Sequence, residues 1–394
     1  MLLAAFLSGP LLIASAASAD CPGSIGTRLI PVPVYSTEPN EGSTWGGMPV
    51  FLRVCNATGR TESITAPSFT SNAIINATTT LRYYGYPTDT QSQTIILSLS
   101  TRINSNLLLR FADVPREAGL FTREIELRWE RSVFYRFFGF GPDTDATQET
   151  SYTRLRAHAN LRGGLNLGGG WNAGLALLLH RDDAQDIGVP GLLLSKRAFP
   201  TAPGMQGSTT FGQTVDLAYD DRPSGEYSDR GKLADLGIGI VEGLAGSPSF
   251  ARGRLRLTAL VPEFDFLAFA GHFDASFVST ANAPFFDQSS LGGSFLLRGF
   301  TENRFIDQGA WTLEAEQRIR LLELHIFGVT ADWRVDPFVG LGQVFHSVDQ
   351  AFSRPRPTAG VGFRAFVHPN VLGRIDVATG GEGLKIYVEI GYPY

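Results

Sequence analysis

The chain has 394 residues, of which 43% are hydrophobic, and a formal net charge of −5. This acidic balance provides no basic surface for nucleic acid, and beyond the first residues no run of about 18 apolar residues predicts a membrane helix. The 44 glycines and 28 phenylalanines, beside only 2 cysteines, are typical of an all-β envelope protein, although many soluble β proteins share this composition.

The start of the chain predicts export. Residues 1–19 form an apolar run that ends in Ala17-Ser18-Ala19, a small-residue cleavage site that would make Asp20 the first mature residue. Residues 20–44 are rich in Pro, Gly and Ser, and we expect them to form an irregular periplasmic segment.

The two cysteines leave one question open. Outside the cytoplasm a Cys21–Cys55 disulfide is chemically permitted. The predicted strands nevertheless place these residues far apart unless the N-terminal segment passes through the lumen of the barrel. Asp20 directly before Cys21 argues against a lipid-modified cysteine.

From residue 45 to residue 394 the chain is expected to form one β-barrel domain of sixteen antiparallel strands. An even number brings the last strand back to the side from which the first one starts. The predicted strands are 45–55, 69–86, 92–102, 105–112, 121–138, 150–163, 170–180, 209–221, 232–242, 251–263, 266–278, 310–322, 331–345, 357–367, 371–379 and 384–394.

These segments alternate between an apolar face and a polar one. Leu313 and its alternate neighbours oppose Glu314, Glu316 and Arg318, and a basic strip of Arg252, Arg254 and Arg256 opposes a face of leucines. A charge at the bilayer midplane costs about 2–4 kcal/mol, so in a membrane these charged faces must point inward. The alternative is a soluble β-sandwich with inside and outside exchanged, but sandwich strands are shorter, typically about 5–6 residues.

The last strand carries a further signal. Residues 384–394 read LKIYVEIGYPY, in which Leu384, Ile386, Val388, Ile390, Tyr392 and Tyr394 share one face. A lipid-facing terminal strand that ends in an aromatic residue is typical of bacterial outer-membrane barrels. Tyr392 and Tyr394 are therefore predicted to form a C-terminal strand signal.

The connections differ in length between the two ends of the predicted barrel. The long segments 181–208 and 279–309 are placed outside, and the short turns 264–265 and 368–370 are placed on the periplasmic side. In the predicted strand order, 279–309 is the sixth outer loop. Long outer loops and short inner turns are the usual asymmetry of these barrels.

Several motifs stand in one order along the chain. They are Phe138-Gly139-Phe140-Gly141-Pro142-Asp143-Thr144, Tyr219-Asp220-Asp221-Arg222, Leu297-Arg298-Gly299-Phe300, Glu316-Gln317-Arg318, Pro337-Phe338-Val339-Gly340-Leu341-Gly342, Gly360-Val361-Gly362-Phe363-Arg364 and Arg374-Ile375-Asp376. This series resembles the BamA/TamA-type outer-membrane assembly and secretion barrels, also called the bacterial surface antigen family. The resemblance covers roughly 45–394.

The resemblance implies a sixteen-stranded barrel whose sixth outer loop folds back into the lumen. The loop anchor would be Leu297-Arg298-Gly299-Phe300, with Glu316 as the main partner of Arg298. The family usually has Asp where this chain has Gly340, so Arg298 is expected to rely on acidic lumen residues. The expected lumen partners are Glu314, Glu316, Arg318 and Asp336.

Members of this family that insert or export proteins usually carry periplasmic POTRA domains before the barrel. Only about 25 residues separate the predicted cleavage site from the first predicted strand. The sequence therefore predicts a short, barrel-only member, for which an insertase function is implied less strongly.

No motif predicts catalysis, a cofactor or a metal site. The six histidines lack metal-ligand spacing, and no G-x-S-x-G nucleophile elbow is present. The first function expected is assistance in inserting or translocating polypeptides at the bacterial outer membrane, with outer-membrane lipid, exported polypeptides and a periplasmic protein as partners. The alternatives are a passive or gated pore, with the basic strip facing Glu314 and Glu316, and a surface receptor.

The insertion hypothesis predicts a weak seam between the first and last strands. Pro49 and Pro393 would each remove a backbone donor there. An incoming strand could then pair with the open edge.

Overall fold

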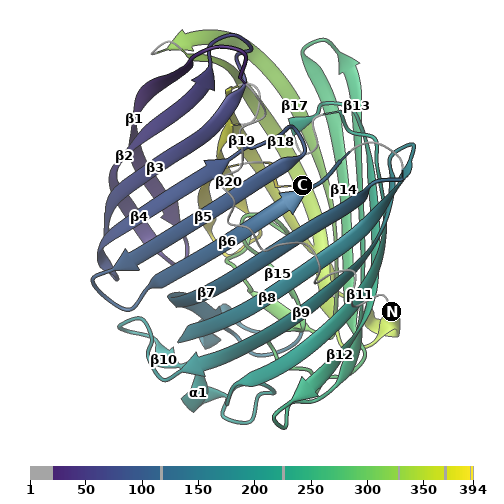
Figure 1. The fold of residues 1–394 in the computed structure, drawn as a ribbon. Coiled ribbons are helices and arrows are strands. Elements are labelled where there is room, and N and C mark those ends of the chain that lie inside the picture. The colour runs from purple at the N-terminus through teal and green to yellow at the C-terminus, as the bar shows by residue number, and fades with distance from the viewer. Residues whose placement is uncertain are drawn as a thin grey trace.

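In a computed structural model the chain forms a cylinder of tilted antiparallel strands (Figure 1). The structure describes residues 21–394 except 116–118, 224–226, 327–328, 368–370, 391 and 394. The predicted signal peptide 1–19 and Tyr394 lie outside the described residues. The predicted all-β barrel is confirmed.

One sheet holds nineteen strands, and without the two-residue strand β10 eighteen strands form the wall in the described part of the chain. The wall strands are β1 Ile25–Glu38, β2 Gly42–Cys55, β3 Thr61–Asn72, β4 Asn76–Gly85, β5 Gln91–Ser100, β6 Ser105–Asp113, β7 Phe121–Phe137, β8 Thr150–Gly168, β9 Trp171–Gln185, β11 Ser208–Asp220, β12 Gly231–Leu244, β13 Phe250–Phe264, β14 Leu267–Val278, β17 Gly309–Ile326, β18 Val329–Phe345, β19 Arg356–Val367, β20 Val371–Thr379 and β21 Leu384–Ile390.

The predicted number of sixteen strands is wrong for two local reasons. The segment 69–86, predicted as one strand, consists of the end of β3, a turn and β4. At this turn Asn72 accepts a hydrogen bond from the Ile74 amide, and Asn76 adopts a positive φ of 60°. The segment expected to be irregular, 20–44, contains β1, whose prolines Pro31 and Pro33 concealed it. Loop 279–308 is therefore the seventh connection on its side and lies between β14 and β17.

The apolar side chains of the wall point outward, and its charged side chains point inward. Leu313 is 52% exposed and Val339 58%, whereas Glu316 in the same sheet is 1% exposed. A soluble sandwich would show the reverse. The orientation required by a bilayer is therefore the one that this sheet adopts.

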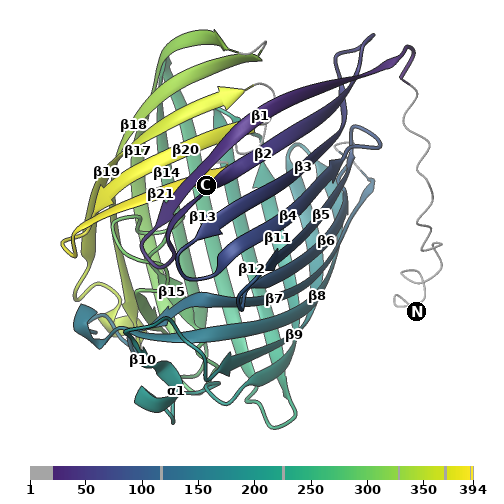
Figure 2. The same ribbon diagram turned by 90° about the vertical axis from the view of Figure 1, so that its left-hand side faces the viewer.

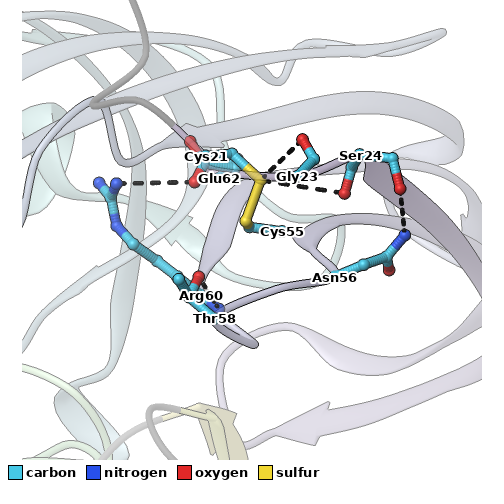
Figure 3. The surroundings of a disulfide bond; sticks show 8 residues. All are labelled: Cys21, Gly23, Ser24, Cys55, Asn56, Thr58, Arg60 and Glu62. Carbon is cyan, nitrogen blue, oxygen red and sulfur yellow. Dashed lines mark hydrogen bonds and ion pairs between the residues drawn. A yellow bond between two sulfur atoms is a disulfide. The ribbon is translucent and has the colours of Figure 1, made fainter.

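The two cysteines are joined because the N-terminal segment is itself a strand. β1 pairs with β2 in a register that sets Ile25 opposite Cys55, so Cys21 lies just beyond the end of the ladder. A disulfide links Cys21 to Cys55, with the two Cα atoms 5.7 Å apart (Figure 3). The N-terminal end of β1 is thus covalently attached to β2.

The long connections fill the outer end of the barrel. Within 186–207 lie β10 (Leu193–Leu194) and α1 (Ser195–Ala198), and within 279–308 lie β15 (Ser289–Leu291) and β16 (Phe305–Asp307). Their side chains meet those of the wall in one buried cluster of Phe137, Tyr152, Ala184, Met205, Phe285 and Ile306. The prediction that loop 279–309, which ends at residue 308 in the structure, folds inward is confirmed.

Candidate functional site

Four carboxylates and four guanidinium groups gather inside the barrel where loop 279–308 meets the wall. None of the eight side chains is more than 2% exposed. The wall members alternate along β17, β18, β19 and β20, so each points inward, and the loop contributes Arg298. This luminal charge cluster consists of Glu314, Glu316, Asp336, Asp376, Arg298, Arg318, Arg364 and Arg374.

Arg298 occupies the middle of the cluster and contacts three wall strands, β17, β18 and β20. Its Nη2 lies 3.0 Å from Glu316 Oε2, its Nε 3.6 Å from Glu314 Oε2, and its Nη1 3.4 Å from Asp376 Oδ2. Its guanidinium carbon also lies 3.5 Å from the ring centroid of Phe338, a cation–π contact. A planar guanidinium offers five donors in a rigid fork, so it can bind several carboxylates in fixed directions, whereas a lysine ammonium offers three donors without that fixed geometry.

The loop tip is shaped to reach the wall. Leu297 adopts a positive φ of 56°, and its amide donates to Glu314 Oε1 at 3.0 Å. At Gly299 a Cβ would lie 2.5 Å from the backbone of Thr379, so only glycine fits there. The Tyr387 hydroxyl of β21 donates to the carbonyl of Phe300. The predicted loop anchor therefore touches the wall at each of its four residues.

Two further arginines, Arg364 on β19 and Arg374 on β20, bind carboxylates of the same cluster. Arg364 Nε lies 3.1 Å from Asp336 Oδ2, and its Nη1 lies 2.7 Å from Asp376 Oδ1. Arg374 bridges the same Asp376 at 3.0 Å to the carbonyl of Ser294 in the loop at 2.9 Å. Glu316 and Asp376 are thus each shared by three arginines, and the cluster holds equal numbers of acidic and basic side chains.

The structure rearranges the partners that the sequence predicts for Arg298. Glu314 and Glu316 are both in contact with it, but Asp336 is paired with Arg364 instead. The partner that sequence reasoning missed is Asp376. The motif Arg374-Ile375-Asp376 was visible in the sequence. Alternation along β20 predicts that the Asp376 side chain points into the lumen, but it does not predict that Arg298 is its partner.

The packing around position 340 explains why a glycine stands there. It stands opposite Glu314 in the β17–β18 register, and a Cβ there would lie 3.2 Å from Glu314 Cγ and 2.7 Å from Thr358 Oγ1. A side chain at position 340 would therefore have to share this space with Glu314.

The predicted basic strip on β13 points into the lumen but does not face Glu314 and Glu316. Arg254 Nη2 lies 2.6 Å from Asp274 Oδ2, and Arg256 Nη2 lies 3.4 Å from Asp235 Oδ2. Arg252 donates to Thr214 Oγ1 at 3.0 Å. Each arginine is engaged by a side chain of β11, β12 or β14, so the polarised eyelet expected for a pore is not formed.

Comparison with known families identifies the fold's lineage. The family model of the Omp85 superfamily domain matches residues 89–380, which is more than half of the chain. The chain belongs to the Omp85 superfamily. No curated protein matches it in sequence.

Solved structures of Omp85-type barrels show the same fold at low identity. BamA from Haemophilus ducreyi lacking POTRA domains 1–3 is similar with a TM-score of 0.56 at 12% identity, covering 92% of this chain and 74% of that one. CdiB from Escherichia coli is similar with a TM-score of 0.52 at 11% identity, covering 93% of this chain and 62% of that one. At these identities the likeness establishes the fold alone.

The C-terminus of this Omp85 barrel departs from the predicted strand signal. Tyr392 follows the end of β21 and is only 2% exposed. The Arg318 guanidinium carbon lies 3.7 Å from its ring centroid, and Arg334 Nη1 donates to its hydroxyl at 3.2 Å. The prediction that Tyr392 faces lipid is wrong, because the chain leaves the strand and turns toward the luminal arginines.

The first and last strands of the barrel lie next to each other (Figure 2). β21 is hydrogen-bonded to β20 and β1 to β2, but in the described part of the chain no ladder joins β1 to β21. Among the wall strands that the structure describes, β1 and β21 are the one neighbouring pair without a ladder. β1 has 14 residues and β21 has 7, so much of the β1 edge extends beyond its neighbour.

Prolines explain part of this gap. Pro31 stands opposite Pro49, and the β2–β3 register is interrupted between Gly47 and Phe51, where Pro49 offers β3 no donor. The nitrogen of Pro31 must then point the other way, to the seam, and Pro33 follows two residues on. The prediction that Pro49 lies at the seam is wrong. Pro31 and Pro33 are the prolines on that edge.

No helix in the described ranges has the length and apolar character to cross a membrane. The same ranges hold no group of three or more His, Cys, Asp or Glu side chains placed to bind a metal ion.

Proposed function

We propose that this Omp85 barrel resides in the bacterial outer membrane and assists polypeptides in entering or crossing it. The open edge of β1 would be the place where an incoming strand pairs, and loop 279–308 would close the lumen at rest. The partners proposed are outer-membrane lipid, exported or membrane-inserting polypeptides and a periplasmic protein that delivers them. The proposal assigns the chain no enzymatic activity.

The seam is the observation that carries this proposal. Among the described residues every other neighbouring pair of wall strands forms a ladder, so β1 and β21 are the two wall strands with one edge that no ladder covers. An unpaired edge in hydrocarbon is costly unless another strand can cover it. A strand added at this edge would recover those hydrogen bonds without breaking an existing ladder.

The luminal charge cluster supports the same function. Arg298 is fully buried among three carboxylates, and loop 279–308 would therefore be held in the lumen in the resting state. Polypeptides would then use the seam while small solutes are retained. A gated pore remains the second candidate, since release of the same loop would open a central path.

A cysteine lock tests the seam. Single cysteines introduced along residues 27–33 of β1 are each combined with Val388→Cys in β21, and outer-membrane and secreted proteins are quantified by mass spectrometry in cells that depend on the variant. We expect an oxidised seam to reduce their amounts and a reductant to restore them.

The control is a lock inside an existing ladder. Val32 and Met48 stand opposite each other in the β1–β2 register, so Val32→Cys with Met48→Cys should cross-link without changing activity. Full activity of a locked seam would refute lateral opening. Loss of activity in the control as well would assign the defect to β1 rigidity instead.

A further inference from the structure

The outer ends of β14, β17 and β18 carry aromatic side chains on the lipid-facing side of the wall. On β17, Trp311 lies on the face opposite to that of Glu314 and on the same face as Leu313, which is 52% exposed. Phe345 shares its direction with Val339, which is 58% exposed. Trp311 and Phe345 pack with Phe273, Phe277 and Leu341 in an apolar patch on the outer face of the wall.

The loop 346–355 folds outward over this patch instead of into the lumen. Trp311 Nε1 donates to the carbonyl of Ala351 at 2.5 Å, and the Trp311 ring lies 5.2 Å from that of Phe352. Trp311 is consequently only 8% exposed although it points away from the barrel.

Gln343 fixes the loop in this position. Its side chain also points outward, yet it is only 1% exposed. Its Nε2 donates to the carbonyl of Gln350 at 2.7 Å and to Ser353 Oγ at 3.1 Å, and its Oε1 accepts from the Arg354 amide at 2.9 Å. A polar side chain on the lipid-facing surface is thus fully satisfied by loop backbone and a hydroxyl.

Two large apolar side chains of this tethered loop remain uncovered. Val348 is 73% exposed and Phe352 is 77% exposed. Burying such a side chain is worth about 1.5–3 kcal/mol, so in water both would be unfavourable. They continue the apolar wall surface outward beyond Trp311, and the polar neighbour Arg354 pairs with Asp143 of another outer loop.

We propose that loop 346–355 is a membrane anchor that inserts Val348 and Phe352 among the acyl chains of the outer leaflet. Its occupant is lipid because the patch is continuous with the lipid-facing wall and its outward direction turns it away from the mouth of the barrel. The proposal requires only that the barrel is embedded in a bilayer. It holds or fails independently of polypeptide insertion.

Spin labels measure the depth of the loop directly. Val348→Cys and Phe352→Cys are labelled in the full chain, whose own cysteines are joined in the Cys21–Cys55 disulfide. The labelled proteins are reconstituted into phosphatidylcholine–phosphatidylglycerol vesicles. Collision with oxygen, which concentrates among acyl chains, is compared with collision with a water-soluble nickel complex.

We expect the ratio of oxygen to nickel collisions at 348 and 352 to be severalfold higher than at an aqueous loop position. Leu313→Cys on the wall is the lipid-exposed control, and Ala146→Cys, an exposed residue of loop 138–149, is the water-exposed control. Ratios equal to that of Ala146→Cys would overturn the proposal. Spin–spin broadening that persists on dilution with lipid would also overturn it, because a second copy would then cover the patch.

Discussion

Gly299 illustrates at the scale of one residue how closely loop 279–308 lies against the wall. A Cβ at this position would approach Thr379 and Gly380 to 2.5 Å, and the adjacent Phe300 ring would in turn lie 2.3 Å from a Cβ built on Gly380. The backbone of the loop and that of the β20–β21 connection therefore touch with no room for a side chain on either. Shape, as well as charge, holds the tip.

We expect Gly299→Ala to loosen the loop while leaving every charge in place. Overpacking of this kind costs about 1–3 kcal/mol, so amide hydrogen exchange should accelerate within 290–305. Gly373→Ala is the matched control, since a Cβ there meets no atom within 4 Å. Equal exchange in the two variants would show that the contact at Gly299 does not hold the loop.

The stability of the turn between β1 and β2 is expected to depend on pH through the carboxyl group of Glu41. Burial, followed by the charges of Glu302 and Glu389, raises the pKa of the Glu41 carboxyl from its ordinary 4.5 to about 7. Between these values the folded chain binds more protons than the unfolded one, so the turn is most stable below pH 4.5 and loses stability as the pH rises through 7.

This dependence is measured by hydrogen exchange of residues 39–42 between pH 5 and pH 8, corrected for the intrinsic rates. We expect protection of the wild-type turn to fall over this interval. Glu41→Gln keeps the side-chain size without the charge and should remove the change. A wild-type turn whose protection is flat with pH would contradict the assignment.

At the scale of the element, β1 combines an open edge with a covalent attachment. Its far edge has no ladder, and Pro31 and Pro33 weaken any ladder that forms there. The disulfide between Cys21 and Cys55 holds the strand to β2 over a sequence separation of 34. A wall strand that is paired on one side only is therefore also attached to its neighbour by a covalent bond.

Reduction of this disulfide is predicted to free β1. For a loop of this length the bond stabilises the folded state by about 3–4 kcal/mol. In Cys21→Ser with Cys55→Ser, exchange of β1 amides should rise while that of β7 and β8, which pair over a long ladder, stays unchanged. A uniform rise in all strands would indicate global destabilisation and not a role specific to the seam.

At the scale of the whole molecule, inward-folded loops pack against the wall at two places inside the barrel. The aromatic cluster around Phe137 fills the outer end, and the luminal charge cluster holds loop 279–308 to β17–β20. Both contacts depend on the inward folding of chain segments, so a change in the loop should alter passage through the entire lumen.

Arg298→Ala is predicted to convert a silent barrel into a conducting one. Removing one partner of a buried ion pair costs about 3–5 kcal/mol, because carboxylates such as Glu316 lose a counter-ion. Planar-bilayer recording should then show openings that the wild type lacks. Arg254→Ala, which removes a more exposed luminal arginine, should remain silent.

A large, stable conductance in the wild type would instead favour a passive pore. Silence of both variants would show that the charge cluster is not what keeps loop 279–308 in the lumen.

The amino-acid sequence by itself determined the barrel class and the inward direction of Glu314 and Glu316. Both follow from period-two alternation, which is a local property of the chain, whereas the inward fold of loop 279–308 was implied by the family resemblance that the motif order carries. The prolines of β1 and the Asn-rich turn after β3 disturbed that local signal, and two strands were missed there.

Only the tertiary structure decided which residues meet across the lumen. Asp376 reaches Arg298 from 78 residues away, Cys21 meets Cys55 because β1 joins the wall, and Tyr392 turns inward to Arg318 and Arg334. Alternation fixes the face on which a side chain lies, but its partner depends on strand register and on closure of the cylinder. Both are set by the packing of the whole chain.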